Sequence, residues 1–236
     1  MLSCSLNIDS RGNKMIEVTY IDHMGSDLSV VNAARVSFNK KSEYIYSKVD
    51  TNGPLEKALH QRDVKLIRYL AKHKHISPFG HAFASFHVKA PVFVARQLVK
   101  HKFLRWNEVS RRYVDSDPEF YKPYDWRGRA DNVKQGSYGV VDLNPELAKN
   151  MVYSSIQDYK YLLSKGVCPE QARMVLPQSM MTEWYWSGSL DAFADMCRLR
   201  GMPDTQQESR EVAAYISDKM MKLFPVSWAA LRGYGQ

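Results

Sequence analysis

Residues 96–113 read RQLVKHKFLRWNEVSRRY, and this segment carries the strongest signal in the chain. Six of its eighteen residues are lysine or arginine, and Glu108 is its only acid. Apolar residues between Val92 and Val99 recur at helical spacing, which predicts a helix with cations at its C-terminal end. A solvated helix end would explain only the positive charge of this segment. It does not explain residues 107–112, which alternate acceptors, donors and forked guanidiniums as a site for a phosphorylated ligand does.

Around this segment the sequence predicts a small sheet. Alternating apolar and polar residues predict one strand beginning at Met15 and another at 82–90. Pro91 then occupies the first turn of the helix that leads into the basic segment, where its missing N–H costs nothing. The polar stretches 39–54 and 114–143 carry turn residues and are predicted loops.

Helical spacing, capping residues and prolines predict about six helices packed with this sheet. The expected helices cover 27–36, 55–72 (as one or two helices), 92–99, 144–165, 169–175, 189–200, and a last one opened by a Thr205-x-x-Glu208 capping box and ended by Pro225. The prediction is therefore an α+β fold, with residues 15–236 as a single domain and 1–14 as a flexible N-terminal extension.

Composition narrows the class of protein. The balance of 33 basic and 25 acidic residues gives a formal charge of +8, which suits an anionic ligand, nucleic acid or an acidic membrane face. Cys4, Cys168 and Cys197 lie far apart, which favours a reducing compartment over a disulfide framework or a zinc site. No window reaches the roughly 18 apolar residues of a membrane span, and no signal peptide is recognisable, so we expect a cytoplasmic protein.

Residues 100–112 resemble the signature of the flavin-dependent thymidylate synthases, R-H-R-x-x-S-x-N-E-x-S-x-R. The matching positions are His101, Asn107, Glu108, Ser110 and Arg112, while Lys100, Lys102 and Arg105 depart from the pattern. Five further segments are similar to family motifs: AARVSF at 33–38, HKHISPFGH at 73–81 with Gly80 where a glutamate is usual, KAPVFVARQ at 89–97, ARMVLP at 172–177, and Leu-Arg at 199–200.

The resemblance implies reductive methylation of dUMP to dTMP. Methylenetetrahydrofolate is the implied carbon donor, and FAD reduced by NADPH is the implied hydride source, since side chains supply no hydride. The chain has no G-x-G-x-x-G motif after a strand, so a Rossmann cradle is not expected and the flavin pyrophosphate is left to the basic segment. The family also implies an intertwined homotetramer, with sites built from more than one subunit.

Family positions carry over to this chain residue by residue. The implied cofactor-binding positions are Ser37, His75, Ser77, Lys100, His101, Lys102, Asn107, Glu108, Ser189 and Asp195. The implied substrate-binding positions are Gln97, Lys100, Glu108, Val109, Ser110, Arg111, Arg112 and Arg173. Arg200 corresponds to the arginine that stabilises negative charge as the pyrimidine ionises, unless it pairs with a buried carboxylate. Ser110 invites a nucleophilic role, but no base is placed to activate it, so we expect it to bind dUMP. No metal site is expected.

Two other functions remain open. Phe103, Trp106 and Tyr113 interleave with the cations as stacking platforms for RNA or DNA do, although no binding-module signature accompanies them. The departures at Lys100, Lys102, Arg105 and Gly80 are also compatible with a catalytically inactive homologue. A bound flavin distinguishes the enzyme from a nucleic-acid-binding protein and from an inactive homologue that has lost the cofactor, and steep salt dependence of oligonucleotide binding indicates the nucleic-acid function.

Overall fold

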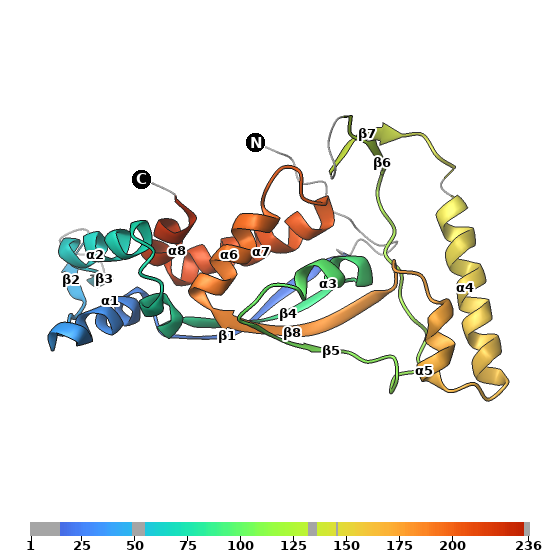
Figure 1. Ribbon diagram of the computed structural model, residues 1–236, viewed down its shortest axis with the longest axis horizontal. Coiled ribbons are helices and arrows are strands. Elements are labelled where there is room, and N and C mark those ends of the chain that lie inside the picture. The colour runs from blue at the N-terminus through green and yellow to red at the C-terminus, as the bar shows by residue number, and fades with distance from the viewer. Residues whose placement is uncertain (1–14, 49–54, 132–135, 145, 234–236) are drawn as a thin grey trace.

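The computed structural model describes residues 15–48, 55–131, 136–144 and 146–233. The molecule is elongated, with a sheet in its middle, α1 and α2 at one end, and α4 and α5 at the other (Figure 1). The expected N-terminal extension lies outside the described residues.

The central sheet has four antiparallel strands in the order β1-β4-β8-β5. The predicted strands are confirmed as β1 (Glu17–Met24) and β4 (Phe83–Pro91). β8 (Met181–Ser189), which the sequence did not predict as a strand, pairs with both β4 and β5. β5 (Leu104–Glu108) lies in the basic segment, for which the sequence predicted no strand, and it forms an edge of the sheet.

One face of the sheet forms the core. Along β4 every second residue is buried, and the side chains between them point to the opposite face. Three helices cover the buried face: α3 (Val92–Leu98), α6 (Leu190–Arg200) and α7 (Gln207–Leu223) (Figure 1). Phe86 and Trp186 pack edge-to-face against Phe193 of α6, at centroid distances of 5.3 Å and 5.6 Å. Such contacts fix how α6 sits on the sheet.

The described residues contain eight α-helices, where about six were expected, and the one helix outside the expected ranges is α8 (Pro225–Arg232). The other helices are α1 (Asp27–Arg35), α2 (Gln61–Lys72), α4 (Glu146–Ser164), α5 (Pro169–Ala172) and α8 (Pro225–Arg232), with short 3₁₀ turns η1 (Val36–Phe38), η2 (Ser77–His81) and η3 (Arg173–Val175). Pro225 ends α7 as predicted and also opens α8, whose first N–H groups donate to Asp27 at 3.0 Å and 2.8 Å.

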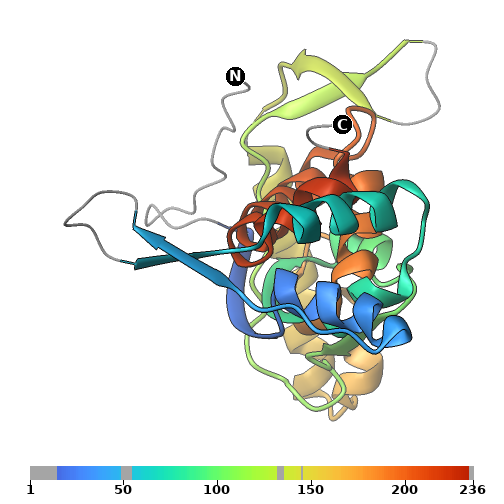
Figure 2. The ribbon, with the colours of Figure 1, turned by 90° about the vertical axis from the view of Figure 1, so that its left-hand side faces the viewer.

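Both predicted loops contribute strands to a hairpin instead. β2 (Ile45–Lys48) pairs with β3 (Leu55–Ala58), and this hairpin projects from the body (Figure 2). β6 (Trp126–Arg129) pairs with β7 (Ser137–Val141). Prediction failed because these are mostly four-residue strands in which apolar and polar residues do not alternate toward a core. The expected helical start at 55 was therefore wrong.

The predicted capping box at Thr205 was also wrong. The N-cap of α7 is Gln206, and the Thr205 hydroxyl donates to the Leu199 carbonyl at 3.0 Å. Glu208 is buried and binds Arg127 and Tyr121 rather than the helix backbone. The Glu208 side chain that the sequence motif assigned to helix capping instead forms an ion pair with Arg127, which is distant in sequence.

A tight reversal carries the chain from α3 into β5. Phe103 adopts a left-handed conformation, with φ of 65°, and so turns the chain back toward the sheet. Gly188 of β8 faces this turn, and a Cβ there would overlap the Leu104 side chain and lie 3.1 Å from the Phe103 carbonyl oxygen. The glycine therefore permits the close approach of Phe103 and Leu104 to the end of β8.

Candidate active site

The short helix α3 separates two cavities. Val92, Ala95, Arg96 and Val99 line the first cavity, of about 900 Å³. Phe93, Gln97 and Lys100 line the second, of about 970 Å³. These two sets follow helical spacing, so they lie on different faces of α3. The segment that the sequence singled out therefore supplies side chains to both cavities.

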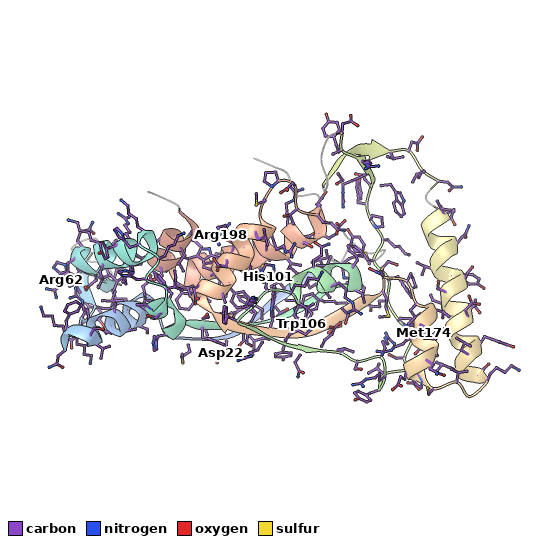
Figure 3. All side chains as sticks on the ribbon, viewed as in Figure 1. Asp22, Arg62, His101, Trp106, Met174 and Arg198 are labelled. Atoms are coloured by element: carbon purple, nitrogen blue, oxygen red, sulfur yellow. The ribbon has the colours of Figure 1, made fainter. Side chains whose placement is uncertain are left out.

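The first cavity gathers most of the implied substrate-binding residues. Its lining includes Glu108, Val109, Ser110, Arg111, Arg112 and Arg173, together with Arg96 and Lys89. Met174, which also lines it, lies at the end of the molecule formed by α4 and α5 (Figure 3). The concentration of guanidiniums gives this cavity the chemistry of an anion site.

Ser110 and Glu108 are held in this cavity by neighbouring side chains. The Ser110 hydroxyl accepts from the Arg112 backbone N–H at 3.3 Å and from Arg112 Nε at 3.4 Å, which leaves its own proton available for a ligand. The Glu108 carboxylate accepts from Trp106 Nε1 at 3.0 Å and from Thr182 Oγ1 at 2.8 Å. Both groups are thus oriented before any ligand binds.

The arginines that line the first cavity differ in their hydrogen bonds. Arg173 donates to the Glu170 carbonyl at 3.2 Å, and the Arg111 side chain donates to the Ser116 carbonyl. Arg96 is exposed and has no hydrogen bond or ion pair among the described residues. Sequence reasoning missed Arg96, although its helical spacing from Val92 and Val99 was a usable signal.

Arg200 and Gln97 meet in the second cavity. Arg200 Nη2 donates to the Gln97 carbonyl at 2.9 Å, and Arg200 Nε donates to His101 Nε2 at 2.9 Å. Burial lowers the pKa of the Arg200 guanidinium, which remains charged because its ordinary value is so high. Within the described part of the chain Arg200 has no carboxylate partner, so the ion-pair alternative is not supported.

His101 differs from what its basic surroundings suggest. Burial, followed by the nearby Arg200 charge, lowers its pKa from 6.5 to about 4, and Asp195 opposes this only partly. The imidazole is therefore neutral at pH 7. It contributes no positive charge toward a phosphate, although it lies in the basic segment that was expected to hold the flavin pyrophosphate.

The Gln97 side chain is fixed from α7. Its Oε1 accepts from the Ser209 hydroxyl at 3.1 Å, and its Nε2 donates to Gln206 Oε1. Beside it, Arg127 donates to both oxygens of Glu208, at 2.7 Å and 2.8 Å, and Tyr121 donates to Glu208 Oε1 at 3.2 Å. Contact with this carboxylate and burial raise the pKa of Tyr121, with burial the larger cause. Sequence reasoning missed this polar wall because its members are far apart along the chain.

A third group of implied positions lies at the end of the sheet nearer α1. Ser37, His75 and Ser77 are exposed, and η2, which carries Ser77, adjoins the start of α6, where the Leu190 N–H donates to the Ala82 carbonyl at 2.9 Å. Ser189 is the N-cap of α6, and its hydroxyl makes no capping hydrogen bond.

The remaining implied cofactor positions do not lie together in one part of the structure. Lys100 and Lys102 are exposed on the α3–β5 turn, close to His101 in the middle of the molecule (Figure 3). Asp195 forms an exposed ion pair with Arg198 at 2.8 Å. Asn107 lies on the face of β5 opposite to Trp106 and Glu108, so this chain alone does not bring it to either cavity.

Other sequence expectations are narrowed by the structure. Trp106 stacks on Trp184 with a centroid distance of 4.3 Å, so it is not a free platform for a nucleic-acid base, whereas Phe103 and Tyr113 are exposed. The described residues include no group of three or more His, Cys, Asp or Glu side chains arranged to hold a metal ion. None of the described helices combines the length and apolar character needed to cross a bilayer.

Comparison with known proteins places these features in context. Residues 19–226 match the family model described as thymidylate synthase complementing protein. The chain is 38% identical over 216 residues to the flavin-dependent thymidylate synthase of Thermus thermophilus, covering 90% of this chain and 74% of that protein. It is 36% identical over 222 residues to the enzyme of the same name from Kosmotoga olearia, covering 92% and 90%.

A solved structure is also similar. The UMP/dUMP methylase PolB from Streptomyces cacaoi, in its complex with 5-Br dUMP, superposes with a TM-score of 0.76 at 29% sequence identity. The match covers 93% of this chain and 96% of that one.

Proposed function

Because this chain belongs to the family of flavin-dependent thymidylate synthases, we propose that its two cavities together form the site in which dUMP is methylated. The protein is an FAD-dependent methyltransferase that converts dUMP to dTMP. Methylenetetrahydrofolate is its carbon donor and NADPH its usual reductant.

The observation that carries the site assignment is the placement of Arg200. Its guanidinium lines the second cavity beside Gln97 and has no carboxylate partner among the described residues. A cation that is fixed and half-buried in this way stabilises negative charge that develops on a ligand. We propose that the Arg200 guanidinium contacts N3 and O4 of the pyrimidine, where negative charge accumulates as C5 becomes nucleophilic.

The first cavity is the proposed phosphate and sugar site. Arg112 and Arg173 offer guanidiniums to the phosphate, and the free proton of Ser110 donates to a phosphate oxygen. Glu108 accepts from a ribose hydroxyl with the lone pairs that Trp106 and Thr182 leave free. In this assignment Ser110 binds the substrate and forms no covalent bond to it.

The implied cofactor-binding positions near both ends of α6 fit FAD. The hydroxyls of Ser37, Ser77 and Ser189 have no hydrogen-bond partner among the described residues, and the Lys100 and Lys102 ammonium groups have no ion pair there. These groups would donate to phosphate and ribitol oxygens of the cofactor, with lysine acting as a point charge. When bound, the flavin supplies the hydride that completes the methyl group. At Gly80 a Cβ would meet no atom within 4 Å, so the missing glutamate leaves open space.

We propose a homotetramer with shared sites. Because α3 lies between the two cavities, a dUMP molecule held by Arg112 in one copy reaches an Arg200 most simply in another copy. Asn107 faces away from both cavities of its own chain, which is also explained if it serves a site shared with a neighbour. The proposed location is the cytoplasm, which fits an enzyme of small-molecule substrates, and we propose no role for nucleic acid or membranes.

The test uses purified protein. The absorption spectrum with and without added FAD reports flavin binding, and incubation with dUMP, methylenetetrahydrofolate and NADPH reports dTMP formation. We expect a yellow protein that needs all three substrates. A colourless protein that forms no dTMP and binds oligonucleotides with steep salt dependence refutes the proposal in favour of nucleic-acid binding. A flavoprotein that binds dUMP but forms no dTMP indicates an inactive homologue.

A further inference from the structure

We propose that His101 is a positioning residue for Arg200, acting as a neutral hydrogen-bond acceptor rather than as a phosphate-binding cation. This inference rests on the proposed role of Arg200 in binding the pyrimidine. Arg200 Nε donates to His101 Nε2 at 2.9 Å, across 99 positions of sequence. The contact joins the α3–β5 turn to the last residue of α6.

Because the guanidinium is rigid, this contact determines how the whole group is oriented. Arginine carries five N–H donors in a rigid plane. One long edge of that plane, formed by Nε and Nη2, is occupied by His101 Nε2 and the Gln97 carbonyl. The adjacent edge, formed by Nη1 and Nη2, has paired donors that no described residue occupies. Because the plane is rigid, fixing the first edge also fixes the direction of the second, which is the edge available to a ligand in the second cavity.

The acceptor role requires a neutral imidazole. A protonated His101 would carry N–H groups on both nitrogens, so Nε2 could not accept from Arg200, and two cations would lie in contact. The charged groups that face the ring are Arg200 and Asp195 of α6, and Lys100 and Lys102 flank it on its own turn. Burial and Arg200 hold the pKa of His101 far below 6.5, which is consistent with that requirement. The neutral ring then has its proton on Nδ1.

Three variants separate this role from others. His101→Gln places an amide oxygen near the position of Nε2, and we expect it to preserve the contact. His101→Asn places its oxygen near the position of Nδ1, out of reach of Arg200, and serves as the matched control. His101→Ala removes the ring altogether. Each is compared for FAD affinity, for kcat with all substrates saturating, and for its dissociation constants for dUMP and 5-fluoro-dUMP.

The fluorinated nucleotide reports how Arg200 is aimed. Fluorine withdraws electrons and makes N3 more acidic, so this ligand carries more negative charge on N3 and O4 than dUMP does at the same pH. We expect the native protein to bind 5-fluoro-dUMP more tightly than dUMP at pH 8, and His101→Gln to keep that preference. His101→Asn and His101→Ala should lose it and should lower kcat about 10²-fold, as misplacing a catalytic group does.

Two outcomes overturn the inference. One is equal behaviour of the Gln and Asn variants, because then the acceptor position does not matter. The other is a loss confined to FAD affinity, with kcat and nucleotide preference unchanged at saturating FAD, which makes His101 a flavin contact only. If the native protein forms no dTMP, the proposed function fails separately, and the nucleotide-binding comparison still decides whether His101 orients Arg200.

Discussion

Arg127 on β6 and Glu208 on α7 form an ion pair at 2.7 Å across 81 positions of sequence. Glu208 is 3% exposed and Arg127 is 25% exposed, so the carboxylate is almost fully removed from water while its partner reaches the surface. This pair fastens the β6–β7 hairpin over the second cavity.

Replacing Arg127 with alanine should destabilise the protein by about 3 kcal/mol, because it leaves the buried Glu208 charge without its partner. Urea denaturation monitored by tryptophan fluorescence measures the loss. The double variant Arg127→Ala/Glu208→Gln is the control and should recover part of the stability, since a neutral amide is cheaper to bury. Equal stabilities of the single and double variants would mean that the unpaired charge of Glu208 does not cause the loss of stability.

Gly188→Ala should destabilise the protein by about 1–3 kcal/mol, as overpacking of a close contact does. The added Cβ meets Leu104 and the Phe103 carbonyl, so β5 must shift away from β8. Gly80→Ala is the matched control, because a Cβ there meets nothing within 4 Å. Thermal unfolding of both variants should show a lower Tm for the first alone.

Ser110→Ala should raise the KM for dUMP about tenfold, the magnitude expected for one lost hydrogen bond to a charged group. The kcat at saturating dUMP should change little, because Ser110 binds substrate in our assignment. Steady-state kinetics over a range of dUMP concentrations distinguish the two parameters. Complete loss of turnover with intact dUMP binding would instead indicate a nucleophilic serine.

Arg200→Ala should lower kcat for dTMP formation by about 10²–10³-fold, as loss of a donor to a developing anion does. Flavin reduction by NADPH should be nearly unaffected, because no pyrimidine anion forms in that step. Stopped-flow measurement of both half-reactions in Arg200→Ala and Arg200→Lys is the test. Equal loss in both half-reactions would contradict a role specific to the pyrimidine.

Acid should destabilise the native protein partly through His101. Its pKa is about 4 when folded and about 6.5 when unfolded, so between these values the unfolded chain binds the extra proton. This group therefore costs stability progressively as pH falls from 6.5 to 4. His101→Gln does not titrate, so its urea midpoint should fall less than that of the native protein between pH 7 and pH 5. Parallel declines would show that His101 does not titrate with a lowered pKa.

Motif positions in the sequence selected Gln97, Ser110 and Arg112, and the structure places each of them in the lining of a cavity. Their roles in binding stay predictions, and their arrangement could not be predicted from the motifs. The division of these residues between two cavities depends on which face of α3 each one occupies. That division became visible only once β5 was known to return along β8, a path that requires the left-handed Phe103 and the small Gly188.

The secondary structure was likewise predictable only where the local sequence carries a pattern. Strands with a buried face, such as β4, were predictable because apolar residues alternate with polar ones. The β6–β7 hairpin is exposed or half-buried, and the described side chains of the β2–β3 hairpin are exposed, so no such pattern marks them. Residues such as Glu208 and Gln206 owe their roles to partners far along the chain, and local sequence carries no record of those partners.

The seven residues of α3 leave this chain little freedom to change length between Pro91 and Phe103. Each residue added to a helix rotates all later side chains by about 100° around its axis. One insertion near Ala95 would rotate Gln97 out of the second cavity and would offset His101 from Arg200. Point substitutions can be compensated one at a time, but a single-codon insertion or deletion here would disturb both cavities at once. Natural variants and engineered loops should therefore vary in length in the hairpins and leave this helix at constant length.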